Sequence, residues 1–146
     1  MNRYWILIAD AAQAKLFAKA NRTKPLELIE AFEHPQSREK RQALTSDRPG
    51  HYQSKGTGHG ALVDASDPKI YQAEQFAKQL AVTLNEGYLN KSFRELVLAA
   101  PPKFYGMLNK HISKQVSANI ATVLAKDYTQ TPDRELSSII NATIIS

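Results

Sequence analysis

The sequence predicts an α/β fold built on a mixed five-stranded sheet, and two observations carry this prediction. In the first part of the chain, three short apolar segments follow one another through short connections. Such strands form an antiparallel meander, because parallel neighbours need a long crossover. Later in the chain, strand-like segments alternate with segments of helical periodicity, which is typical of parallel strands joined by right-handed crossovers. The order that satisfies both observations is 3-2-1-4-5, with helices on the faces of the sheet.

The first three strands are predicted from the apolar runs and from the turn residues between them. Residues 4–9 are apolar and rich in aromatic and β-branched side chains, and residues 14–19 follow after four residues. Turn-forming residues at 21–25 then precede a third run at 26–33. In this third strand the alternation predicts that four side chains share one side of the sheet, namely Leu26, Leu28, Glu30 and Phe32.

Helices and strands alternate from residue 67 onward. Asp67 followed by Pro68 is typical of a helix start, since the Asp side chain caps free amides and Pro suits the first helical position. Apolar side chains recur at helical spacing to Leu84, and Gly87 is predicted to end this helix. The remaining elements are expected as a strand at 95–100, a helix with an apolar stripe over 104–116, a strand at 120–128 and a helix capped at 131–133 and reaching 140.

A long segment at 36–67 has no regular period. Four of the six glycines in the chain fall between Gly50 and Gly60. Long segments of this kind are uncommon inside a domain, and they are usually either functional or mobile. We therefore expect one domain over residues 1–146, with a long Gly-rich loop after the third strand.

The composition excludes several classes of protein. The chain of 146 residues has a net charge of +5 and no cysteine. Without cysteine there are no disulfide frameworks, thiolate zinc sites or cysteine nucleophiles. The apolar runs are too short for a secretory signal or a membrane span, so a cytoplasmic protein is expected.

Positive charge is concentrated in two segments. Residues 36–60 carry five basic and two acidic side chains, residues 96–126 carry four lysines and no acid, and the rest of the chain sums to −2. This distribution predicts an anionic partner, most commonly phosphate, whereas the alternative is that the lysines only keep the domain soluble. The bases expected to converge on one surface are Arg48, Lys55 and, on one face of the second helix, Lys103, Lys110 and Lys114.

The predicted strand order resembles the ribonuclease H-like arrangement, so a metal-dependent nuclease is the first catalytic class to consider. Such enzymes need several carboxylates around two metal ions. Asp10 follows the first strand and Glu74 lies on the long helix, but the fourth strand ends at residues 99–102 without an acid. This absence argues against a nuclease, and Asp10 is instead expected to bind nearby backbone amides.

The long loop contains residues that could form a zinc site or a phosphate-binding loop, but the sequence pattern supports neither. His51, His59, Asp64 and Asp67 are potential zinc ligands, but their spacing fits no known ligand pattern. Residues 56–60 could present amides to a phosphate, but they match neither a Walker A loop nor a dinucleotide fingerprint. His34 and His111 are expected to be structural. No catalytic constellation, metal site or cofactor is therefore expected.

Several short motifs, taken in order, resemble the bacterial host attachment protein family, described as proteins required for attachment to host cells. The resemblance extends over nearly the whole chain. The motifs are WILIAD at 5–10, AKLF at 14–17, HP at 34–35, SDRPG at 46–50, KGTGHGA at 55–61, DP at 67–68, LVLAAPPKF at 96–104 and KDYT at 126–129.

This family is in turn similar to the middle domain of archaeal and eukaryotic peptide-chain release factors, which implies the same fold here. In those factors a basic Gly-rich loop after the third strand carries a Gly-Gly-Gln tripeptide. The corresponding segment of this chain has no Gly-Gly-Gln, so peptide release is not implied. The resemblance implies an RNA-contacting role for Lys55 and His59.

Three hypotheses follow. The first is a non-catalytic domain that associates with ribosomal or other RNA through Arg48, Lys55 and His59 and through the basic helix face. The second is a factor for host-cell attachment or another protein interaction, as the family description suggests. The third is a hydrolase that uses His51 and His59.

Overall fold

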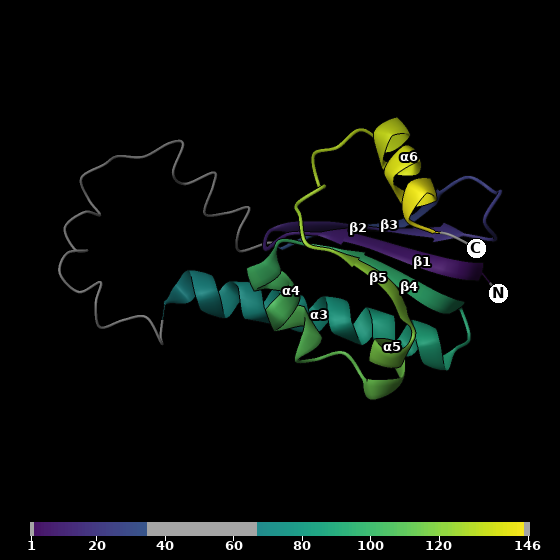
Figure 1. Ribbon diagram of the computed structural model, residues 1–146. Coiled ribbons are helices and arrows are strands. Elements are labelled where there is room, and N and C mark those ends of the chain that lie inside the picture. The colour runs from purple at the N-terminus through teal and green to yellow at the C-terminus, as the bar shows by residue number, and fades with distance from the viewer. Residues whose placement is uncertain (1, 35–66, 145–146) are drawn as a thin grey trace.

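The five strands form one mixed sheet in the order β3-β2-β1-β4-β5, as the sequence predicts (Figure 1). The computed structural model describes residues 2–34 and 67–144. β1 pairs antiparallel with β2 and β2 with β3, whereas β1 and β4, and β4 and β5, are parallel. The Gly-rich loop predicted at 36–67 lies, apart from Asp67, outside the described residues. The strands are β1 (Asn2–Ala9), β2 (Gln13–Lys19), β3 (Glu27–Glu33), β4 (Phe93–Ala99) and β5 (Ile120–Leu124).

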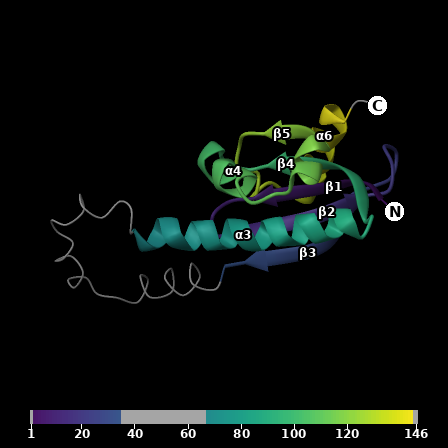
Figure 2. The same ribbon diagram turned by 90° about the horizontal axis from the view of Figure 1, so that it is seen from below.

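The helices form one layer on each face of the sheet (Figures 1 and 2). The connections to β4 and to β5 advance across the sheet in the same direction, so right-handed crossovers put their helices on the same face. The last helix packs on the opposite face. None of these helices is long and apolar enough to cross a membrane. The first layer holds α3 (Pro68–Leu89), α4 (Pro102–Asn109) and α5 (Lys114–Ala118), and the second holds α6 (Asp133–Thr143).

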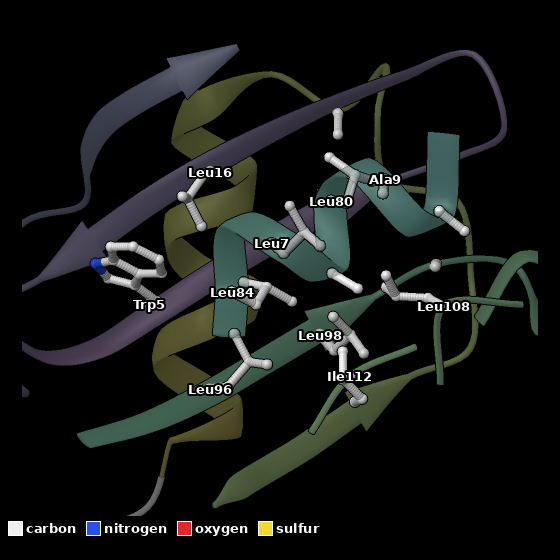
Figure 3. Packing of buried hydrophobic residues seen from close by; sticks show 14 of the residues in the cluster. Trp5, Leu7, Ala9, Leu16, Leu80, Leu84, Leu96, Leu98, Leu108 and Ile112 are labelled. Atoms are coloured by element: carbon white, nitrogen blue, oxygen red, sulfur yellow. The ribbon is translucent and has the colours of Figure 1, made fainter. Parts of the chain in front are cut away.

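The protein has two hydrophobic cores, one on each face of the sheet, and β1 contributes to both because both of its faces are covered. Trp5 and Leu7 pack with the α3 layer, whereas Ile6 and Ile8 pack with α6. Figure 3 shows Leu80 and Leu84 of α3 among the side chains of the sheet. A central strand of this kind has no solvent face, which explains its continuous apolar run.

The long helix begins where the sequence predicts, but it continues past Gly87. The Asp67 side chain caps α3 by accepting a hydrogen bond from the Lys69 amide at 2.8 Å. Gly87 lies inside α3, which ends at Leu89. A Cβ on Gly87 would lie 2.4 Å from two ring carbons of Trp5, so glycine allows the helix to cross the indole. The prediction that Gly87 ends the helix is therefore wrong.

The single helix predicted over the stripe at 104–116 is instead two helices. α4 ends at Asn109, and α5 begins after Ser113, whose hydroxyl accepts a hydrogen bond from the Val116 amide at 3.1 Å. Asn85 of α3 stabilises the break, since its side chain bonds the His111 carbonyl at 3.2 Å and the Ser113 amide at 2.8 Å. The apolar residues of the stripe nevertheless remain buried in the core or pack against it.

β3 does not present the four predicted side chains on one side. Glu30 pairs with Leu16 and Leu28 pairs with Phe17, which leaves Ile29 as an extra residue in β3. Since Leu16 and Phe17 face opposite sides of the sheet, Glu30 and Leu28 do so as well. A β-bulge therefore overturns the predicted alternation.

The boundaries of the last strand and of the last helix also differ from the prediction. β5 stops at Leu124 rather than at residue 128. α6 begins after Pro132, and no side chain caps it.

We predict that Gly87→Ala destabilises the fold by about 1–3 kcal/mol, because the new methyl group must displace the buried Trp5 ring. Gly106→Ala is the matched control, since nothing lies within 4 Å of a Cβ at Gly106. It should stabilise α4 by about 0.5–1 kcal/mol through helix propensity. Urea unfolding of both variants measures the two effects, and a stabilising Gly87→Ala would contradict this account.

Candidate functional site

A pocket of about 460 Å³ lies where β1 and β4 end and where α3 and α4 begin. In open α/β sheets, ligands bind outside the carboxyl ends of the parallel strands, so this is the expected place for a site. The described part of the lining is mostly apolar, with three charged side chains. The apolar residues are Ala11, Ala12, Ile70, Ala73, Pro101, Phe104 and Met107, and the charged residues are Asp10, Lys69 and Lys103.

Asp10 forms the hydrogen bonds that the sequence predicts. Its carboxylate accepts from the amides of Ala12 at 2.8 Å and Gln13 at 3.0 Å, which shapes the turn between β1 and β2. The other carboxylate oxygen lies 3.1 Å from the hydroxyl of Thr129. That hydroxyl is also 2.5 Å from Asp127, so Asp10 links the end of β1 to the segment after β5.

Glu74, the second carboxylate considered for metal binding, belongs to a different cluster. It accepts from His111 Nε2 at 2.9 Å and forms an ion pair with Lys110 at 3.2 Å. The hydrogen bond from His111, followed by the interactions with Lys110, lowers the pKa of Glu74, while partial burial opposes this shift. His111 is thus a structural residue with a hydrogen-bond partner, as predicted. Within residues 2–34 and 67–144, no three acids or histidines gather as a metal would require.

The three predicted lysines are exposed, but they do not share the face of one helix. Lys103 is in the first turn of α4 and lines the pocket, Lys110 is the C-cap of α4, and Lys114 begins α5. Lys103 lies near the start of α3, because it lines the pocket together with Ile70. Lys114 lies near the end of α3, because the neighbouring Ser113 forms a hydrogen bond with Asn85. Residues 70 and 85 of a helix are about 22 Å apart, so the lysines are spread along α3.

Lys69 is a pocket residue that the sequence reasoning missed. It is exposed in the first turn of α3 and lines the pocket together with Lys103. The signal was present, because the helix start at Asp67 and Pro68 fixes the position of Lys69. Lys69 lies outside both basic segments, residues 36–60 and 96–126.

Arg48, Lys55, His51 and His59 lie outside the described residues. The residues that flank this segment are described, and both adjoin the pocket. The His34 amide donates to the carbonyl of Ala12, a pocket residue, at 3.0 Å, and Asp67 caps α3. The His34 ring is buried and stacks on Phe76 with centroids 5.5 Å apart, which agrees with a structural role.

We predict that Glu74→Gln lowers the free energy of unfolding by about 1 kcal/mol near neutral pH, because it removes the charge that pairs with Lys110. The lowered pKa of Glu74 means that this contribution is present above the ordinary glutamate pKa of 4.5 and is lost as the pH falls through the lower pKa of the folded state. The difference between Glu74→Gln and the wild type should therefore shrink as the pH falls from about 5 towards 3.

Urea unfolding across this pH range tests the prediction. Glu86→Gln on the exposed side of α3 is the control and should leave stability unchanged. A destabilisation by Glu74→Gln that is independent of pH would contradict an electrostatic role for Glu74.

Solved structures with a similar fold include an archaeal translation termination factor. The alignment has a TM-score of 0.54 and 10% sequence identity, and it covers 97% of this chain and 35% of that chain. At this identity the likeness shows the fold alone, and the chain corresponds to about a third of the factor's length. No curated protein matches the sequence significantly.

A family model adds a relationship at the level of sequence. The model described as "Protein required for attachment to host cells" matches residues 5–140. The match extends from β1 into α6 and thus includes the residues that form the pocket. The chain therefore belongs to the family of proteins required for attachment to host cells.

Proposed function

We propose that this protein is a non-catalytic domain that associates with RNA or with the ribosome. The fold shared with a translation termination factor and the concentration of positive charge in two segments support this proposal. In the proposed complex, Arg48, Lys55 and His59 contact phosphate together with Lys103, Lys110 and Lys114.

The observation that carries the proposal is the position of the chain that flanks the first basic segment. His34 and Asp67 both adjoin the pocket at the carboxyl ends of β1 and β4, where Lys69 and Lys103 are exposed. The described residues on either side of the segment that contains Arg48 and Lys55 therefore lie near Lys69 and Lys103. A shared basic surface of this kind attracts a polyanion through release of counterions.

The described lysines differ in how much charge they can offer to a phosphate. Within the described residues Lys103 and Lys114 form no ion pair, whereas Lys110 is paired with Glu74 at 3.2 Å. A lysine that is already paired gains less from a phosphate, because it must share or break its existing contact. Lys103 and Lys114 should thus contribute more to binding than Lys110.

We propose binding rather than catalysis because the two carboxylates considered for metal ions have other partners. Asp10 bonds backbone amides and Thr129, whereas Glu74 bonds Lys110 and His111. Recruiting both carboxylates to one metal centre would require both networks to break.

We predict that ribosome or RNA association weakens steeply as the salt concentration rises. For single-stranded RNA the slope of log K against log salt is about 0.7 for each phosphate contact. Lys103→Ala or Lys114→Ala should therefore each reduce the slope by about 0.7, and Lys110→Ala by less. The triple change of Lys103, Lys110 and Lys114 to Glu should abolish binding. Co-sedimentation with ribosomes and filter binding to RNA over a salt series measure these effects.

Arg134→Glu on α6 is the control for Lys103→Glu, because both variants change the net charge equally but on opposite faces of the sheet. If Arg134→Glu and Lys103→Glu weaken RNA binding equally, the loss reflects the net charge of the protein and not a contact made by Lys103. The absence of any bound wild-type protein at low salt would defeat the proposal.

The family description favours a second candidate function, in which the protein takes part in attachment to host cells. Direct attachment requires the protein on the outside of the cell. Protease treatment of intact cells should then degrade it while a cytoplasmic marker survives. Full protection of the protein until the cells are lysed would argue against a direct role.

A further inference from the structure

We propose that the pocket between β1, β4, α3 and α4 binds a small organic anion, which consists of an apolar body and one phosphate, sulfonate or carboxylate group. This ligand differs from the polyanion of the proposed function, and the inference does not depend on that function.

The volume and the walls of the pocket suit the apolar body. A volume of about 460 Å³ lies within the range of about 300–1,000 Å³ that is usual for small-molecule sites. Ala73 and Phe104 form buried parts of the wall, and Ile70 remains 38% exposed although it is a large apolar side chain. Covering such a surface with an apolar ligand removes it from water, which is favourable.

The charges at the pocket select an anion. Lys69 and Lys103 both line it, and within the described residues neither forms an ion pair. Of the described lining residues, only Asp10 has a carboxylate, and it already accepts hydrogen bonds from the Ala12 and Gln13 amides. Among the described lining residues, two ammonium groups outnumber one carboxylate, so this lining carries a net positive charge and favours a negatively charged group.

The start of α4 adds hydrogen-bond donors beside these charges. The N-cap of α4 is Pro101, and no side chain caps the helix. Because Pro102 has no N–H, the amides of Lys103 and Phe104 are the first donors of the helix. Since Lys103 and Phe104 both line the pocket, an anionic group there could accept hydrogen bonds from the backbone as well as from lysine.

A matched pair of fluorescent probes tests the proposal on the full chain. 1-Anilinonaphthalene-8-sulfonate has an apolar body with one anionic group, and N-phenyl-1-naphthylamine has the same body without the charge. We expect saturable binding of the sulfonate at one site. The double variant Lys69→Ala/Lys103→Ala should weaken sulfonate binding about tenfold, equivalent to about 1.4 kcal/mol, and leave the uncharged probe unaffected.

Two kinds of control variant complete the experiment. Lys78→Ala/Arg134→Ala removes the same number of charges from exposed positions outside the lining and should leave both affinities unchanged. Ala73→Leu should fill the pocket and weaken both probes. If circular dichroism shows that Ala73→Leu does not fold, Ala11→Phe at the exposed rim serves the same purpose.

Three results would overturn the proposal. The first is an unchanged sulfonate affinity in Lys69→Ala/Lys103→Ala. The second is an equal loss of affinity in Lys78→Ala/Arg134→Ala. The third is undiminished binding of both probes in the folded pocket-filling variant, which would assign them to another surface. RNA binding is a separate measurement, so its failure and the failure of this proposal are distinguishable.

Discussion

The burial of β1 on both faces is the constraint on which the rest of the molecule depends. Its side chains alternate between the α3 layer and α6, so both layers must be in place for the strand to lose contact with water. The burial of β1 also constrains the sequence of α3, because this helix can cross Trp5 only at a residue without a side chain, Gly87. The position of β1 also fixes Asp10 at its carboxyl end, where α3 and α4 begin and the pocket forms.

The sequence predicts those features that local chemistry determines. The strand order follows from short connections, apolar runs and the handedness of crossovers, and the start of α3 follows from Asp67 and Pro68. Features that depend on contacts between distant residues could not be predicted in this way. The break between α4 and α5 involves Asn85, which precedes it by more than twenty residues, and the role of Gly87 depends on Trp5.

The same distinction applies to the candidate site. Lys103 could be identified as a basic residue from charge counts. The helix start at Asp67 and Pro68 places Lys69 in the first turn of α3, but that Lys69 and Lys103 line the same pocket follows only from the packing of α3 and α4. The ion pair between Lys110 and Glu74 likewise depends on the packing of two segments, and it makes Lys110 less available for the predicted contact with phosphate. Counting charges along the chain measures their number, whereas their availability to a ligand depends on packing.

The edge of the sheet at β3 has a consequence for how copies of the protein behave towards one another. Leu28 is 53% exposed and Ile29 45% exposed on this outer strand, which would invite pairing with a second sheet. The extra residue at Ile29 bends the strand, and exposed Glu27 and Glu30 add like charges along it. Both features oppose pairing between two copies of this edge, because like charges repel each other and the extra residue interrupts the regular hydrogen-bonding pattern of the strand.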